Sequence, residues 1–185
     1  NLATIQGDLD IRNNASLTNL GGISGLETIT GYLSVASNGQ LSNLNGLAKL
    51  GTIGTDGASG GYLYIYNNAA LTSLGLDNLT SVAGYVQIQY NAKLETLNGL
   101  AALQKIGGNL DVSSNIVLSS ILYLIYPSGV LNELCGNLTI AGNSKLSVCQ
   151  AQALYTSLTN AGWTKTFAQN NNLACAGTCS GTACQ

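Results

Sequence analysis

Hydrophobic residues recur along this chain with a period of about two dozen positions. An aliphatic residue opens each period, and successive openings are separated by 24, 24, 29, 24 and 28 residues. The opening residues are Ile5, Ile29, Ile53, Val82, Ile106 and Leu134. An asparagine column keeps the same phase, with a leucine three residues after each member: Asn14, Asn38, Asn68, Asn91, Asn115 and Asn143. Six copies in register predict a repeat fold in which each copy is one structural unit.

Each unit contains a short run in which apolar and polar residues alternate, as in 9–11, 63–65 and 86–88. Such alternation is typical of a strand with one buried face. The rest of each unit follows the pattern L-x-x-L-x-G-L-x-x-L and has too little charge or alanine for a long helix. We therefore predict a mainly β, single-domain β-solenoid of about six coils over residues 1–149. Neighbouring coils would lie about 4.8 Å apart. The inward asparagines would bond backbone groups of their own and the next coil.

The period fades after Cys149, and residues 150–185 are expected to form a C-terminal cap. The segment Gln150–Ala161 carries Leu154 and Leu158 four residues apart, as a short helix would. Gly162 is the expected end of that helix, and Trp163 is expected to cover the last coil.

The cysteines predict a stapled cap and an oxidising, extracellular compartment. Four of them lie at the start of the cap and in the tail: Cys149, Cys175, Cys179 and Cys184. We expect Cys149–Cys175 with Cys179–Cys184, although four cysteines allow three pairings. A zinc site is the alternative, but the tail spacing C-x3-C-x4-C does not fit one and the chain has no His. Cys135, in the last coil, is interpreted as a buried free thiol, with an intermolecular bridge as the alternative.

Composition narrows the classes of function. Charged residues make up 8% of the chain and the net charge is -2, so no basic face exists for a nucleic acid. The absence of His removes Ser-His-Asp triads and two-His metal sites, and the residues indicate no metal and no cofactor. No apolar run approaches the roughly 20 residues of a membrane-spanning helix.

Catalysis is difficult to build from the carboxylates. Asp10 and Asp111 share a column but would lie roughly 19 Å apart at the inter-strand spacing, which is too far for a glycosidase pair. A polysaccharide lyase and an ice-binding protein are the weaker alternatives, the latter because the column Thr4, Thr28, Thr52 stops at Ser81. We expect a protein that is not an enzyme.

The pattern I/V-x-G-x-L-x-I-x-x-N-x-x-L-x-x-L-x-G-L-x-x-L, over about residues 2–149, resembles the receptor L-domain family. The resemblance implies a leucine-rich-repeat-like, right-handed β-helix, as in the ectodomains of insulin and epidermal growth factor receptors. It implies an extracellular or cell-surface location. The coils of this chain are more uniform than those of the growth-factor receptors, so the resemblance does not imply hormone binding.

Residues that flank the inward Leu and Ile of each strand are expected to point outward. In the central coils they form a face of tyrosine and glutamine, which suits recognition of a protein or a glycan. The face comprises Tyr32, Tyr62, Tyr64, Tyr66, Tyr85, Gln87, Gln89 and Tyr90. Stacked tyrosines also stabilise strands in the absence of any ligand, and that interpretation stays open.

A second candidate surface is the apolar segment Ser119–Gly129, with Tyr123 and Tyr126, which is interpreted as an insertion. Exposed, it would be a patch that requires a partner; packed down, it would only cover the flank of the solenoid. A polar insertion around Thr55–Gly60 is expected to be a mobile loop. Glycosylation sequons begin at Asn14, Asn78 and Asn137, of which Asn14 is expected to be unmodified because it belongs to the inward column.

The first coil has no preceding capping segment, since the chain begins within a repeat. Either upstream sequence is missing, or another molecule covers this end. Two functions follow: recognition or adhesion at the cell surface, or a structural subunit that assembles head to tail into a filament through its first coil. The partners are accordingly a protein or glycan ligand, or copies of the same chain.

Overall fold

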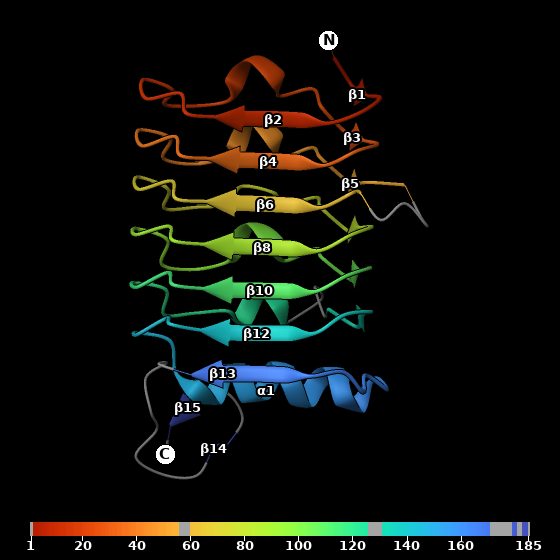
Figure 1. Ribbon diagram of the computed structural model, residues 1–185, viewed down its shortest axis with the longest axis vertical. Helices are drawn as coiled ribbons and strands as arrows, with labels where there is room; N and C mark the ends of the chain where they lie inside the picture. Colours follow the sequence, from red (N-terminus) through yellow and green to blue (C-terminus); the bar gives the residue numbers. More distant parts are fainter. Residues whose placement is uncertain (1, 56–59, 126–130, 171–178, 181–182, 185) are drawn as a thin grey trace.

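Parallel strands from successive coils stack into two sheets that run the length of the molecule (Figure 1). The structure is a computed structural model that describes residues 2–55, 60–125 and 131–170, with the backbone of 179–180 and 183–184. In spatial order, the long-stranded sheet comprises β13 (Phe167–Asn170), β12 (Leu138–Ala141), β10 (Leu110–Ser113), β8 (Val86–Gln89), β6 (Leu63–Tyr66), β4 (Leu33–Ala36) and β2 (Leu9–Arg12). The second sheet comprises β1 (Thr4–Ile5), β3 (Thr28–Ile29), β5 (Thr52–Ile53), β7 (Ser81–Val82), β9 (Lys105–Ile106) and β11 (Glu133–Leu134). The predicted β-solenoid is confirmed.

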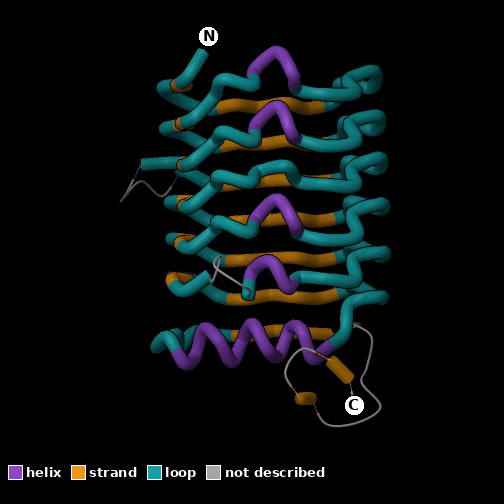
Figure 2. Tube along the Cα trace, turned by 180° about the vertical axis from the view of Figure 1, so that it is seen from behind, coloured by secondary structure: helices purple, strands orange, loops and turns teal. Residues whose placement is uncertain are grey.

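Short 3-10 helices close several of the coils on the side opposite the long-stranded sheet, as Figure 2 shows. They are η1 (Gly21–Ile23), η2 (Asn45–Leu47), η3 (Asn98–Leu100) and η4 (Leu122–Leu124). The leucines and isoleucines of the repeat lie between these helices and the two sheets and form one continuous core. In the first coil, however, Leu9, Ile11 and Leu17 are only partly buried, because the described residues place a neighbouring coil on one side of them only.

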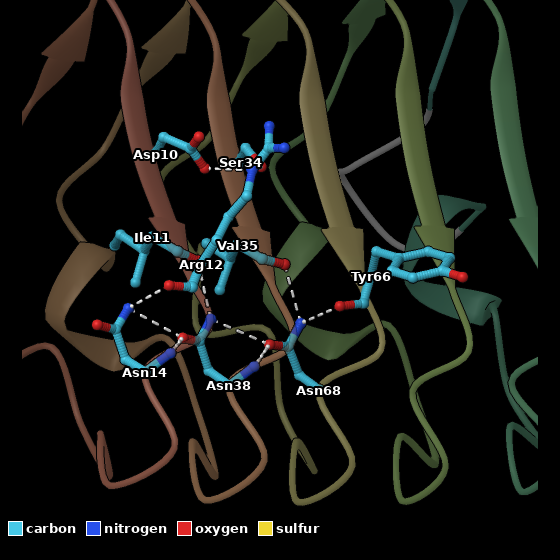
Figure 3. Close-up of polar contacts among 9 residues, drawn as sticks. All are labelled: Asp10, Ile11, Arg12, Asn14, Ser34, Val35, Asn38, Tyr66 and Asn68. Carbon is cyan, nitrogen blue, oxygen red and sulfur yellow. Dashed lines mark hydrogen bonds and ion pairs between the residues drawn. The ribbon is translucent and has the colours of Figure 1, made fainter.

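The inward asparagines form a hydrogen-bonded ladder, shown for its first three members in Figure 3. Each backbone N–H donates to the side-chain Oδ1 of the asparagine in the next coil, at 3.0–3.1 Å. Each amide nitrogen from Asn38 onward donates to a strand carbonyl of the preceding coil, as Asn38 does to Ile11 at 2.8 Å. The ladder therefore satisfies buried backbone groups where the chain leaves each long strand, as the sequence predicted.

The residue before each ladder asparagine adopts the left-handed conformation, which the sequence analysis did not anticipate. The column is Asn13, Ser37, Asn67, Tyr90, Ser114 and Gly142, with φ between 53° and 66°. Asn and Gly tolerate this conformation, whereas a bulky side chain is strained there. Tyr90 is the outlier of the column.

The C-terminal cap has the predicted helix and one additional strand. Ser147 caps the start of helix α1 (Val148–Asn160), because its hydroxyl accepts a hydrogen bond from the backbone N–H of Cys149. Gly162 follows the end of the helix at φ 92°. Trp163 is buried and its indole donates to the carbonyl of Gly136 at 2.9 Å, so it covers the last coil as predicted. β13 then pairs with β12, which the sequence analysis missed.

The cysteine predictions have mixed outcomes. Cys149 is buried and disulfide-bonded. The side chains of Cys175, Cys179 and Cys184 lie outside the described residues, so the pairings stay predictions; Cys179 and Cys184 are register partners of the antiparallel pair β14 (Cys179–Ser180) and β15 (Ala183–Cys184). The interpretation of Cys135 as a buried thiol was wrong: Cys135 follows β11 at a coil corner, where its thiol is free and exposed.

Candidate functional site

The outward residues of the long-stranded sheet form three columns in the register that the sequence predicted. The first column runs Asp8, Tyr32, Tyr62, Tyr85, Asn109 and Asn137. The second runs Asp10, Ser34, Tyr64, Gln87, Asp111 and Thr139, and the third Arg12, Ala36, Tyr66, Gln89, Ser113 and Ala141. Together they form one surface, termed here the outer face.

Tyrosines occupy the centre of the outer face and stack on one another. The ring centroids of Tyr32 and Tyr62 are 4.5 Å apart and those of Tyr62 and Tyr85 are 4.6 Å apart, with nearly parallel planes. This spacing matches the distance between neighbouring strands, so the rings continue the periodicity of the backbone. Partial burial raises the pKa of Tyr62 and of Tyr85. We term these three residues the tyrosine ladder.

A second tyrosine group lies beside the ladder. Tyr64 and Tyr66 on β6 stack on each other at 5.4 Å, and Tyr90 packs its ring edgewise on Tyr66 at 5.3 Å. Burial raises the pKa of Tyr64 as well. Tyr90 is 52% exposed despite its left-handed backbone. All six tyrosines that the sequence assigned to this surface are thus brought together.

The outer face is less uniform over β4 than predicted. Ser34 and Ala36 were expected to be exposed but are buried. The reason is the size of their column neighbours: Ala36 lies between Arg12 and Tyr66, and the Arg12 guanidinium reaches over to donate to the Ser34 hydroxyl at 3.1 Å (Figure 3). Arg12 also pairs with Asp10, so both charges are compensated within the first coils.

Polar residues replace tyrosine toward the C-terminal coils. Gln89 donates to Oδ2 of Asp111 at 2.8 Å and to the hydroxyl of Ser113 at 3.0 Å. A concavity of about 360 Å³ lies beyond the tyrosine ladder, lined by Tyr85, Gln87, Asn109, Asp111, Asn137 and Thr139. Asn109, Asp111 and Thr139 flank inward residues and were expected only to point outward, with no site at this place. The signal was available, because polar residues follow tyrosine in the first two columns.

The segment Ser119–Gly129 has the packed-down arrangement over its described part. Ile121 and Leu124 belong to the core, and η4 occupies the place that η3 has in the coil before, so 119–125 is regular repeat rather than insertion. Tyr123 is 40% exposed on the side opposite the outer face. Tyr126 lies outside the described residues, as do 56–59 of the predicted loop.

The side chains of the three sequon asparagines are all accessible. Asn78 and Asn137 are exposed, and the Asn78 amide donates to the carbonyl of Ala48 at 2.7 Å. Asn14 is also exposed, although it belongs to the inward column, because its coil is the first. The proposed modifications at Asn78 and Asn137 stay predictions.

Comparison with known families gives one match. The sequence profile of the Receptor L domain matches residues 2–94, which is half of the chain. The chain belongs to the Receptor L domain family. Receptor L domains are extracellular, non-catalytic modules that bind protein ligands. The coil pattern of this Receptor L domain continues beyond the matched segment through β12. No curated protein and no solved structure matches the chain significantly.

Among the described residues, no helix has the length and apolar character needed to cross a bilayer. Within the same residues, His, Cys, Asp and Glu side chains form no group of three or more that is suited to a metal ion.

Proposed function

We propose that this Receptor L domain is a secreted or cell-surface recognition module that binds its ligand on the outer face, without catalysis. The observation that carries the proposal is the gathering of six tyrosines on one side of the solenoid. Tyrosine offers a large amphipathic contact area and loses few rotamers on binding. Such residues are enriched where binding energy concentrates in interfaces.

Tyr90 supports a role beyond strand stabilisation. Its φ of 57° places a bulky residue in a conformation that other coils give to Asn, Ser or Gly. The strain costs about 1–2 kcal/mol and is not repaid by burial, because half of the side chain is exposed. Strained residues of this kind cluster at active sites and at sites that clamp a ligand.

The absence of catalysis is proposed from the chemistry of the same face. Asp10 is neutralised by Arg12, and Asp111 is bonded to Gln89 at one oxygen. Asp8 accepts a hydrogen bond from the backbone N–H of Tyr32 at 3.0 Å. Apart from two alanines, the remaining column members are amides, hydroxyls and rings, which suit hydrogen bonding and stacking rather than proton transfer.

The experiment is a binding screen with a matched pair of variants. Wild-type protein is tested against an array of purified extracellular proteins and an array of glycans, and every binder is retested with Tyr64→Ser/Tyr66→Ser and with Tyr123→Ser. All three Tyr→Ser changes remove a partly exposed ring, but only the first variant alters the outer face. We expect the double variant to weaken binding at least about tenfold, and Tyr123→Ser to leave it unchanged.

Thermal denaturation of each variant establishes that the fold is intact. Absence of any binder, or a binder lost with Tyr123→Ser and kept by the double variant, contradicts the proposal.

A second candidate function, self-assembly, is favoured by the first coil. A largely apolar depression of about 370 Å³ lies there, with Leu9, Ile11, Leu17, Leu20 and Ile23 among its lining residues. A second copy of the chain seated on it would bury these side chains and extend the sheets from β1 and β2.

A further inference from the structure

The tyrosine ladder ends abruptly at Tyr85. The next member of its column is Asn109, whose short side chain turns to the adjacent coil and accepts a hydrogen bond from the backbone of Asn137 at 2.8 Å. Among the described residues, no ring therefore stacks on Tyr85 from that side, whereas Tyr62 stacks on the other. The concavity of about 360 Å³ occupies this place, with Tyr85 as one wall.

The size of the concavity fits one residue of a larger ligand. Its volume lies at the low end of the range of about 300–1,000 Å³ found for small-molecule sites. At the inter-strand distance of about 4.8 Å, a six-membered ring placed over Asn109 would continue the stack that Tyr32, Tyr62 and Tyr85 begin.

The other walls are polar and partly unsatisfied. Oδ1 of Asp111 is buried and has no hydrogen-bond partner among the described residues, while Oδ2 accepts from Gln89. An unpaired buried carboxylate oxygen costs free energy, which a ligand hydroxyl would recover by donating to it. Asn109 and Asn137 both use their Oδ1 to accept backbone N–H groups, at 2.8 Å and 3.2 Å. Their amide nitrogens have no protein acceptor within the described part of the chain, so they are donors for a ligand.

These groups select between ligand chemistries. The six lining residues include one carboxylate and no cation, so an anionic group is disfavoured. An aromatic side chain of a protein ligand would stack on Tyr85 but would leave Asp111 Oδ1 and both amides unpaired. A sugar ring has an apolar C–H face for the tyrosine and hydroxyls at its rim, each of which both donates and accepts.

We propose that the concavity between Tyr85 and Asn137 binds one uncharged sugar residue of a glycan, stacked on Tyr85 and hydrogen-bonded by Asp111 and the two asparagines. The proposal rests on the outer face being the binding surface and names its ligand. The tyrosines over β6 would then contact the neighbouring part of the same glycan.

The test fills the concavity with a tyrosine, the residue that three other coils carry at the same position of the repeat. Asn109→Tyr extends the tyrosine ladder by one ring into the concavity, and it leaves Tyr64, Tyr66 and Tyr90 in place. The probes are uncharged oligosaccharides of glucose, mannose, galactose and N-acetylglucosamine, and binding is measured by calorimetry and by chemical-shift changes. We expect at least one probe to bind wild-type protein. Asn109→Tyr should weaken that binding at least about tenfold, and so should Asp111→Ala.

Tyr123→Ser is the matched control, because it changes an exposed ring far from the concavity, and it should bind like wild type. Thermal denaturation shows whether each variant is folded; if Asn109→Tyr does not fold, Asp111→Ala and Asn137→Ala decide. Absence of binding by every probe, or binding that survives these substitutions, overturns the sugar proposal. A protein ligand that is lost with Tyr64→Ser/Tyr66→Ser but kept by Asn109→Tyr also overturns it, and leaves the proposed function intact.

Discussion

At the scale of single residues, the asparagines of the ladder hold neighbouring coils together through hydrogen bonds to buried backbone groups. Each ladder asparagine from Asn38 to Asn115 bridges three coils: its own, the preceding coil, whose strand carbonyl accepts from its side-chain amide, and the next coil, to which its backbone N–H donates. Hydrophobic columns alone would leave these buried backbone groups unpaired. An amide is the side chain that both donates and accepts there, which explains why Asn recurs in each coil.

The asparagine ladder predicts that the stability lost on replacing an asparagine depends strongly on its position in the ladder. Asn91→Ala leaves the backbone N–H of Asn68 and the carbonyl of Ile65 without their side-chain partners inside the molecule. The loss is expected to be about 2–5 kcal/mol in the free energy of unfolding. Asn14→Ala, at the exposed first coil, should cost less than about 1 kcal/mol. Chemical denaturation of both variants measures the difference, and equal losses would contradict the ladder's role.

At the scale of elements, how far the sequence predicts the structure depends on whether the repeat specifies it. The register of the repeat alone determines which residues share a column. The inward and outward faces of the long-stranded sheet were therefore predictable, and so was the stack of Tyr32, Tyr62 and Tyr85. β13 was not, because Gln169 stands at the inward position where other coils have Ile or Val, and the alternation of 167–170 is lost. The buried Ser34 could not be foreseen either, since its cover is supplied by the length of Arg12 in the neighbouring coil. The concavity arises from a change of size between Tyr85 and Asn109, which becomes visible only once the register is known.

The tyrosine ladder is expected to make the stability of the fold fall at alkaline pH. Burial raises the pKa of Tyr62 and of Tyr85 in the folded state, and neighbouring tyrosines raise that of Tyr62 further. Between the ordinary tyrosine pKa of about 10 and the raised folded value, the unfolded chain loses protons first. The contribution of these tyrosines is therefore complete below about pH 10 and is lost as the pH rises through the folded pKa.

Thermal midpoints measured across this range test the effect. Wild-type protein should lose stability more steeply above about pH 10 than the Tyr62→Phe/Tyr85→Phe variant, which keeps the rings but not the hydroxyls. Parallel declines in the two proteins would show that the tyrosine ladder does not cause this fall in stability.

At the scale of the whole molecule, the two ends of the solenoid differ in chemistry. The first coil presents the aliphatic side chains of Leu9, Ile11 and Ile23, whereas α1 covers the last coil and turns Thr156 and Asn160 to solvent. An apolar depression and a polar helix are poor partners, because the contact would bury unpaired hydroxyls and amides. Recognition on the outer face is therefore favoured over head-to-tail assembly.

This asymmetry predicts the state of association. Sedimentation velocity over a wide range of concentration should give one species near the chain mass of 18.9 kDa. If the mass instead grows with concentration and Ile11→Lys restores the single species, self-assembly through the first coil is the better proposal.

The asparagine ladder also gives the solenoid a direction. Within the asparagine ladder, each backbone N–H from Asn14 to Asn115 donates to the Oδ1 of the asparagine in the next coil toward the C-terminus. Oδ1 of Asn14 receives no donor from the described residues and is exposed. A further coil in the same orientation would donate its own backbone N–H to this oxygen. Duplication of an internal coil would preserve this direction of the ladder hydrogen bonds. A coil in the reversed orientation would instead place its own acceptor oxygen against the Oδ1 of Asn14. A duplicated internal coil would therefore fit the ladder without a change in the core, and it would add three positions to the outer face.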